Sequence, residues 1–361
     1  MIEDTRALGE AAQADVLPAG ARLGPYTLRE RLGEGGMGIV YRAEQSHPIA
    51  RSVALKLIKR GMDTAQVIRR FESEREALAL MNHPGIARVL DAGRSDDGRP
   101  YFVMEHVAGL PLDAFCDQQR LDNRSRLRLL VQVCGAVHHA HQRGIIHRDL
   151  KPSNILVTQV DGRPAPKVID FGLAKAMDAR LAGDRTAFTR AGAVLGTPEY
   201  MSPEQAESGV DVDTTTDIYS LGVVLYQLLV GALPFEPLRP RRGVLSTLPQ
   251  ASRPLDPVRP STRLLHLGDT AVEVAEKRAT DVAALGRELA GDLDWIALKA
   301  MEHDRTRRYA SASELAADIE RYLAHQPIQA RPPSLRYRVG KAAGSLRSRP
   351  QMAGVVAACP S

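Results

Sequence analysis

The feature that most constrains the fold is the order of the expected elements, because strand-like segments come first and helix-like segments come later. Short runs of strand-forming residues, separated by Gly, Pro and polar clusters, predict an antiparallel sheet before about residue 108. From Leu110 onward helical patterns dominate. This segregation predicts an α+β protein with two parts. The expected strands are 26–32, 39–43, 53–58, 86–90 and 101–106, and the expected helices are 64–81, 127–142, 217–230, 292–301 and 313–323.

The length and charge of the chain narrow the class of protein. A chain of 361 residues fits a two-lobed body with tails, since single cores seldom grow past roughly 250 to 300 residues. Its 44% hydrophobic and 25% charged residues argue against wholesale disorder. The net charge of +5 comes from the end of the chain, because seven Arg and Lys residues and no acidic residue follow Glu320. No nucleic acid is therefore expected among the partners.

Cysteine usage and the N-terminus predict a cytoplasmic location. Three widely spaced cysteines form no zinc-binding pattern and favour a reduced chain. The N-terminus lacks the apolar core of a secretory signal, and no stretch is apolar for long enough to span a bilayer. His138, His139 and His141 share one expected helix, where we expect surface histidines rather than metal ligands, since no Cys or carboxylate accompanies them.

A glycine-rich sequence, G-E-G-G-M-G-I-V, occupies residues 33–40 between two expected strands. Glycine lets backbone N–H groups approach phosphate oxygens where a Cβ would collide. An ordinary Gly-rich hairpin is the alternative for an isolated copy, whereas a dinucleotide-binding turn needs a helix next and here a strand follows. The residues of this loop are Gly33, Glu34, Gly35, Gly36, Met37 and Gly38, followed by Ile39 and Val40.

Lys56 ends the apolar run Val53-Ala54-Leu55-Lys56. Burying an ammonium group without an anionic partner is costly, so this lysine needs an anion. A lysine that reaches the surface is the alternative for a lysine considered alone. The expected helix that follows supplies three candidate partners, Glu72, Glu74 and Glu76.

Two further motifs carry acidic residues and an amide. Residues 147–154 read H-R-D-L-K-P-S-N, and residues 170–172 read D-F-G. Carboxylate and amide oxygens can hold hard cations, and a further carboxylate can orient a hydroxyl group. Each residue alone could belong to a turn, but the full ordered set is very improbable by chance.

With these motifs the chain resembles the eukaryotic-like serine/threonine protein kinases, most closely the bacterial ones, over about residues 26–325. The resemblance implies a bilobal protein kinase fold, with a small antiparallel-sheet N-lobe that carries one helix and a larger, mainly helical C-lobe. The expected segments are a flexible leader (1–25), the N-lobe (26–108), the C-lobe (109–325) with an irregular Pro- and Arg-rich insertion at about 234–263, and a basic, disordered tail (326–361).

The resemblance also implies roles for the motif residues. The Gly-rich loop would cover the ATP phosphates, and Lys56 would hold the α- and β-phosphates while paired with a helix glutamate. Glu74 is the preferred partner because of its distance from His83-Pro84, and Glu76 stays open. The other implied roles are hydroxyl orientation by Asp149, charge neutralisation by Lys151, and binding of Mg²⁺, or alternatively Mn²⁺, by Asn154 and Asp170.

Further residues are implied to shape the site. Leu32, Val40, Ala54, Met104 and Leu156 would enclose the adenine, with backbone groups of Glu105 and Val107 as hydrogen-bonding partners. Glu204 is expected to pair with Arg308, and Asp217 to brace the catalytic loop. The remaining structural residues are His147, Arg148, Phe171, Gly172 and Thr197.

Two segments imply which kind of hydroxyl group accepts the phosphoryl group. Lys151-Pro152 and Gly196-Thr197-Pro198-Glu199-Tyr200 are similar to those of kinases that act on serine and threonine. Ser202-Pro203-Glu204 departs from the family's usual Ala-Pro-Glu but keeps the glutamate. A pseudokinase scaffold is the main alternative, and it normally lacks one of the lysine and aspartate residues that are present here. A small-molecule phosphotransferase normally lacks the peptide-docking segment.

Two further expectations concern regulation by phosphorylation and the role of the basic tail. Arg148 beside Asp149 favours control by phosphorylation at Thr186 or Thr189, in a transient homodimer, although both could be plain loop threonines. The basic tail is read first as a disordered end. Contact with anionic lipid, or truncation before the spanning helix of a membrane-anchored form, are the alternatives.

Overall fold

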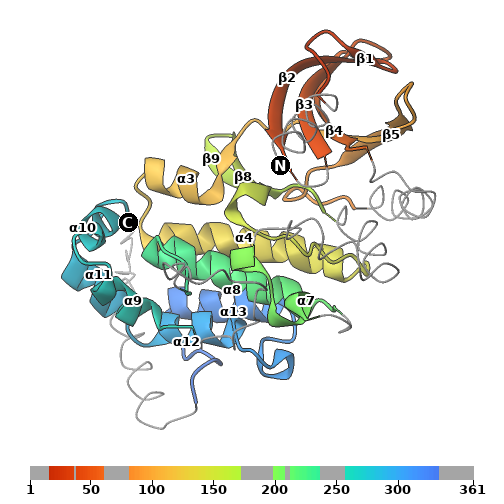
Figure 1. The fold of residues 1–361 in the computed structure, drawn as a ribbon. Coiled ribbons are helices and arrows are strands. Elements are labelled where there is room, and N and C mark those ends of the chain that lie inside the picture. The colour runs from red at the N-terminus through yellow and green to blue at the C-terminus, as the bar shows by residue number, and fades with distance from the viewer. Residues whose placement is uncertain are drawn as a thin grey trace, which may run out of the picture.

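The computed structural model of the chain describes residues 16–35, 38–60, 81–171, 198–207, 212–235 and 257–332. Within these residues a six-stranded antiparallel sheet forms a small lobe, and helices form a larger lobe beside it (Figure 1). The predicted α+β class and bilobal arrangement are confirmed. The strands of the first sheet, in the order β1-β2-β3-β4-β6-β5, are β1 (Arg22–Leu23), β2 (Tyr26–Glu34), β3 (Gly38–Gln45), β4 (Arg51–Ile58), β5 (Val89–Arg94) and β6 (Pro100–Glu105).

Alternating burial and one required glycine explain the curled sheet of the small lobe. Side chains of β3 alternate between buried and less buried positions, as expected for a strand with one face on a core. Its first residue, Gly38, lies so close to β4 that an added Cβ would be 2.5 Å from the carbonyl oxygen of Leu57. The sheet encloses its own apolar cluster, which includes Leu28, Ile39 and Leu55, each at most 1% exposed.

The larger lobe is built around two long helices, α4 and α8, that lie side by side in its centre (Figure 1). Asp122 caps α4 by accepting from the Ser125 N–H at 2.8 Å, and α8 ends at Gly231, whose φ of 71° favours glycine. The described α-helices are α3 (Leu112–Gln118), α4 (Asn123–His141), α7 (Pro203–Ala206), α8 (Thr215–Val230), α9 (Pro260–His266), α10 (Thr270–Glu276), α11 (Val282–Leu289), α12 (Asp292–Ala300) and α13 (Ala312–Leu323).

A short three-stranded sheet connects the two lobes. It has the order β7-β8-β9, formed by β7 (Leu110–Pro111), β8 (Ile155–Val160) and β9 (Arg163–Val168). Val168 donates its N–H to the Gly85 carbonyl at 2.8 Å and accepts from the Ala87 N–H at 3.0 Å. The β8–β9 hairpin is thereby fixed to the segment that leads into β5 of the small lobe.

The expected leader and tail are both too long. Arg22 and Leu23 pair with β2, and Leu23 is 4% exposed, so the leader expected to run to residue 25 includes part of the sheet. Ile328 is 5% exposed, and the N–H of Ala330 donates to the Asp318 carboxylate at 2.8 Å. The tail expected from residue 326 therefore begins with packed residues, because apolar contacts and hydrogen bonds to α13 hold them.

The expected irregular insertion at about 234–263 also differs from the structure at its end. Residues 260–263 belong to α9, which begins at Pro260, a favourable first helical residue. Leu264 of this helix is 1% exposed and packs in the core, which explains why the segment is helical despite its Pro- and Arg-rich surroundings. Residues 236–256 of the expected insertion lie outside the described part of the chain.

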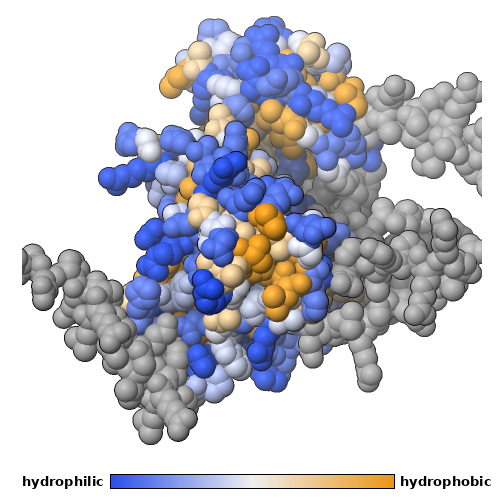
Figure 2. Space-filling view, turned by 90° about the vertical axis from the view of Figure 1, so that its left-hand side faces the viewer, coloured by the Kyte–Doolittle hydropathy of each residue, from blue (hydrophilic) through white to orange (hydrophobic). Residues whose placement is uncertain are grey.

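The side of the molecule that carries α9 and α10 is mostly hydrophilic, with one region where hydrophobic residues gather (Figure 2). Leu265 of α9 and Val272 of α10 are 77% and 54% exposed. No helix in the part of the chain that the structure describes combines the length and the apolar character needed to span a bilayer.

Candidate active site

The described residues of the glycine-rich loop lie at the end of β2 and at the start of β3. Gly33 and Glu34 pair with Val40 and Ile39, and the Gly35 N–H donates to the Gly38 carbonyl at 2.9 Å. A Cβ added at Gly33 or Gly35 would meet no protein atom within 4 Å. Protein packing therefore does not require glycine at these two positions, whereas close approach of a ligand phosphate to the backbone would.

Lys56 on β4 lies opposite Val40 in the register of the sheet. Its ammonium group contacts the Asp170 carboxylate at 2.9 Å, with the two side chains 11% and 21% exposed. The expected partner, Glu74, and its alternative, Glu76, lie outside the described residues. The contact with Asp170 joins the small lobe to the end of the β8–β9 hairpin.

Asp149, Lys151 and Asn154 come together in the loop before β8. The Lys151 ammonium lies 2.9 Å from the Asp149 carboxylate. The Asn154 side-chain N–H₂ donates to the Asp149 carbonyl at 2.7 Å and to its carboxylate at 3.1 Å. These contacts hold the Asp149 carboxylate between a cation and an amide.

The same hairpin places Asn154 next to Asp170. Ile155 and Val168 pair at its open end, and the Ile169 N–H donates to the Asn154 carbonyl at 2.9 Å. Because the amide nitrogen of Asn154 is bonded to Asp149, its amide oxygen remains for a cation. An amide oxygen and a carboxylate match the ligands that Mg²⁺ uses alongside water and phosphate oxygens, so the residues fit such an ion.

His147 and Phe171 connect these loops to each other. The Asp149 N–H donates to Nδ1 of His147 at 3.3 Å, so Nε2 carries the hydrogen and donates to the Ile169 carbonyl at 2.9 Å. The ring of Phe171 packs edge-on against His147, with the ring centroids 4.8 Å apart. His147 and Phe171 thus pack against each other, and His147 also links the Asp149 N–H to the Ile169 carbonyl.

Asp217 at the start of α8 holds the backbone of the catalytic loop. Its two carboxylate oxygens accept from the N–H groups of His147 and Arg148, each at 2.8 Å, as the sequence predicted. His141 contacts the same carboxylate through Nε2 at 2.7 Å. Burial alone would raise the pKa of Asp217, but the contact with His141 and the backbone hydrogen bond lower it below its usual range.

His141 is thus a correction to the sequence analysis, which expected a surface histidine. Its side chain is 6% exposed because α4 packs against α8. No cluster of three or more potential metal ligands is found among the described His, Cys, Asp and Glu residues. The sequence carried no signal for this contact, since 76 positions separate the two partners.

The residues expected around the adenine lie on strands that meet between the lobes. Ala54 on β4 and Met104 on β6 are cross-strand neighbours and are 8% and 6% exposed. Val40 and Leu156 are partly buried, while Leu32 is 46% exposed. Glu105 and Val107 follow in the segment that links the lobes, with partly buried side chains.

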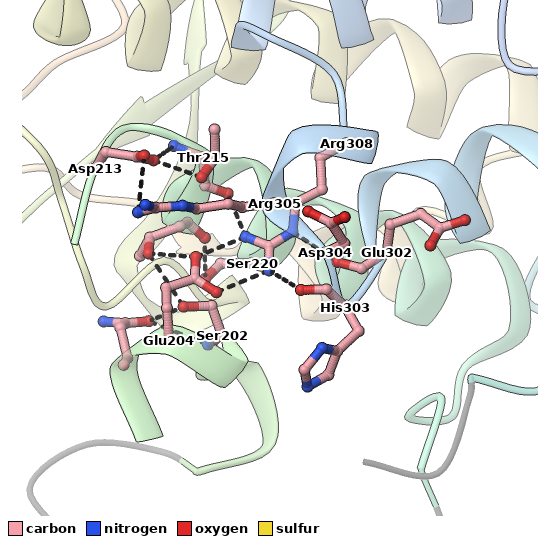
Figure 3. A network of polar contacts seen from close by, with 12 residues as sticks. Ser202, Glu204, Asp213, Thr215, Ser220, Glu302, His303, Asp304, Arg305 and Arg308 are labelled. Atoms are coloured by element: carbon pink, nitrogen blue, oxygen red, sulfur yellow. Dashed lines mark hydrogen bonds and ion pairs between the residues drawn. The ribbon is translucent and has the colours of Figure 1, made fainter. Parts of the chain in front are cut away.

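A buried ion pair fixes the segment 198–207, which follows residues outside the described part of the chain (Figure 3). Arg308 donates to both carboxylate oxygens of Glu204, at 2.6 and 2.8 Å, and the pairing expected from the sequence is present. Burial would raise the pKa of Glu204, but the hydrogen bonds from Arg308 lower it to about 2. The same carboxylate accepts from the Thr216 hydroxyl on α8 at 2.8 Å.

Several expected site residues cannot be placed. They are Gly36, Met37, Glu74, Gly172, Thr186, Thr189 and Thr197, which lie outside the described residues.

The fold and the site together define a class of protein. A glycine-rich loop, a buried lysine paired with an aspartate, and an Asp–Lys–Asn group lie where a β-sheet lobe meets a helical lobe. This is the arrangement of a nucleotide-dependent phosphotransferase of the protein kinase type.

Comparisons with known proteins agree with this class. The family model of the protein kinase domain matches residues 26–256. The chain is 38% identical over 305 residues to serine/threonine-protein kinase pkn3 of Myxococcus xanthus, covering 84% of this chain and 54% of that protein. It is 36% identical over 311 residues to serine/threonine-protein kinase PknB of Mycobacterium tuberculosis, covering 84% and 44%. The chain therefore spans about half the length of these curated relatives.

A solved structure gives the same result for the fold. The PknI kinase domain of Mycobacterium tuberculosis matches with a TM-score of 0.59 and 26% identity, covering 86% of this chain and 99% of that structure. The chain belongs to the protein kinase domain family, and its relatives are bacterial serine/threonine kinases of the eukaryotic-like type. The predicted resemblance is confirmed.

Proposed function

We propose that this chain transfers the γ-phosphoryl group of ATP to serine or threonine hydroxyl groups of other proteins. The observation that carries the proposal is the junction of Lys56, Asp170 and the Asp149 loop at the open end of the β8–β9 hairpin. When bound, ATP supplies the transferred group and a divalent ion neutralises part of its charge.

The described residues suit distinct parts of this reaction. Asp149 would orient the acceptor hydroxyl and take its proton, because its carboxylate is fixed by two contacts and is 37% exposed. Lys151, 2.9 Å from that carboxylate, would neutralise charge on the phosphoryl group. Lys56 would hold the α- and β-phosphates. Asn154 and Asp170 would bind Mg²⁺, with Mn²⁺ as the alternative ion.

A radiolabelled-ATP assay on a library of Ser- and Thr-containing peptides tests this proposal. Lys56→Met and Asp149→Asn should each lower kcat by about 100-fold or more, because each removes a charge at the reacting groups. Asp161→Asn is the matched control, since Asp161 is exposed in the β8–β9 turn and has a φ of 50° that asparagine tolerates. Assays in Mg²⁺ and in Mn²⁺ compare the two ions.

The alternative functions give different results in the same assay. Nucleotide binding without transfer by the wild-type chain would identify a pseudokinase scaffold. Transfer to small hydroxyl compounds but not to peptides would identify a small-molecule phosphotransferase. Equal activity of wild type and Asp149→Asn would refute the role of Asp149.

Control by phosphorylation is part of the proposal. Phosphorylation at Thr186 or Thr189 would add a dianion that the arginine beside Asp149 can bind, and transfer between two transiently paired copies would supply it. Mass spectrometry of wild type and Asp149→Asn, expressed separately, tests this. Active but unphosphorylated wild-type protein would refute the switch.

The proposal also covers the boundaries of the two lobes, the partners of the kinase domain and its location. We propose a small lobe up to residue 108 and a large lobe from residue 109, with protein substrates and ATP as partners and no nucleic acid. The basic residues of the expected tail (326–361) would add weak contact with anionic lipid, which co-sedimentation with phosphatidylserine vesicles tests. A cytoplasmic location of the kinase domain is part of the same proposal.

A further inference from the structure

Gln205, which the sequence analysis did not single out, bonds to the catalytic loop. It lies in α7, directly after Glu204. Its side-chain oxygen accepts from the Ser202 N–H at 3.1 Å, which closes a capping box at the start of the helix. Because the amide oxygen is engaged there, the amide nitrogen is turned away and donates to the Arg148 carbonyl at 2.8 Å.

The bonded residue has an unusual backbone conformation. Arg148 has a φ of 68°, in the left-handed region that L-residues rarely adopt. Residues held in this region need surrounding contacts that fix them, and such residues cluster at functional sites. Arg148 is fixed on both sides, since Asp217 accepts from its N–H at 2.8 Å and Gln205 donates to its carbonyl.

The next residue along the chain is Asp149. The Arg148 carbonyl belongs to the peptide group that includes the Asp149 N–H, so fixing that plane also fixes the backbone from which the Asp149 side chain extends. The Asp149 N–H is itself bonded to His147 at 3.3 Å. Gln205 is therefore connected to Asp149 through a single planar group.

We propose that Gln205 is a positioning residue for the phosphoryl transfer reaction. It holds the left-handed Arg148 peptide and thereby couples the segment around Glu204 to the orientation of the Asp149 carboxylate. The inference rests on the proposed function for its effect on the reaction. The coupling itself is a property of the folded chain and can be measured without nucleotide.

The chemistry of the side chain gives a sharp test. Glutamate serves as well as glutamine in a capping box, so Gln205→Glu keeps the hydrogen bond from Ser202. The second oxygen of the new carboxylate would, however, face the Arg148 carbonyl, and two acceptors repel each other. A capping role predicts that the variant is normal, and a positioning role predicts that it is impaired.

The experiment compares wild type, Gln205→Glu and Ala206→Glu in the full chain. Ala206 is the exposed neighbour on the same helix, so Ala206→Glu adds the same charge without facing Arg148. Gln205→Glu should lower kcat at least tenfold with KM for ATP unchanged, while Ala206→Glu stays within twofold of wild type. Gln205→Met removes both the donor to Arg148 and the capping acceptor without adding charge, so it should also lower kcat and speed exchange at residues 147–149, which keeps the inference falsifiable if Gln205→Glu folds poorly.

Hydrogen exchange supplies the second measurement. The amides of residues 147–149 in nucleotide-free protein should exchange at least tenfold faster in Gln205→Glu, while the amides of α8 keep wild-type rates. A wild-type chain without kinase activity would refute the proposed function, yet this exchange result would still decide the coupling. The inference is overturned if kcat and exchange are unchanged in both Gln205 variants, or if Ala206→Glu is impaired equally.

Discussion

Removal of Arg308 should be among the most destabilising single changes in the large lobe. Its side chain is fully buried, and its donors are shared among the Glu204 carboxylate and the carbonyls of Glu302, His303 and Thr215. Arg308→Met would leave the 7% exposed Glu204 carboxylate without its cation. Breaking a buried pair in this way costs about 3–5 kcal/mol.

The lowered pKa of Glu204 also shows how strongly the folded chain stabilises its carboxylate. The difference between its ordinary value of 4.5 and about 2 in the folded chain corresponds to about 3 kcal/mol. Because the folded-state pKa is the lower one, this stabilisation is complete above pH 4.5 and is lost as the pH falls toward 2. Arg308 is the main cause of the lowered pKa, so the free energy of unfolding of Arg308→Met should fall by about 3–5 kcal/mol at neutral pH.

Urea unfolding followed by fluorescence measures this loss. Trp295 is the single tryptophan of the sequence and lies on α12 of the large lobe, so its emission reports on this lobe. The double variant Glu204→Leu/Arg308→Met leaves no unpaired charge and should recover part of the lost stability. A loss below about 1 kcal/mol, or a double variant less stable than Arg308→Met, would show that the pair does not act as described.

Two further predictions concern the glycine-rich loop and the support of the catalytic loop. Gly38→Ala should lower Tm, because the added Cβ would lie 2.5 Å from the Leu57 carbonyl, whereas Gly33→Ala should leave Tm unchanged and raise KM for ATP, because only a ligand would meet its Cβ. Differential scanning fluorimetry and nucleotide titration check both, and a similar Tm loss in the two variants would contradict the reasoning. Asp217→Asn should lower kcat, because an amide can replace only one of the two acceptors that hold the His147 and Arg148 N–H groups at 2.8 Å. Steady-state kinetics check it, and a kcat within twofold of wild type would contradict the support role.

The sequence predicted those parts of the site that depend on ordered motifs. The order of strands before helices gave the fold class, and the strands containing Ala54 and Met104 formed close to the expected bounds. The pairing of Glu204 with Arg308 spans 104 positions and was available only through the family resemblance. A family motif can thus predict a contact between residues far apart in the sequence, which the local periodicity of hydrophobic residues cannot.

Contacts that depend on packing were not predictable in this way. His141 lies on a helix whose exposed and buried faces cannot be assigned until α8 is placed against it. Ser202 and Gln205 form a capping box in the structure, but nothing in the sequence could show that the N–H₂ group of Gln205 reaches the Arg148 carbonyl. The predicted ends of the leader and the tail were wrong because packing extends the fold beyond them. Leu23 pairs with Tyr26 in a short hairpin and packs in the small-lobe cluster, and Ile328 packs in the core of the large lobe.

The burial of α8 has a consequence for how the chain would lose the proposed activity on heating. Most of this helix is buried, its first turn carries Asp217, and Arg278 caps its last carbonyls at Leu228 and Leu229. The backbone of the catalytic loop is thus held from the interior of the large lobe. In the small-lobe sheet one face has a separate apolar cluster, whereas Ala54 and Met104 on the other face belong to the cluster of the large lobe. Loosening of the small lobe should therefore lower both nucleotide affinity and turnover before the helical interior melts, because Lys56 lies on β4 of that lobe, while Asp217 still holds the backbone of the catalytic loop.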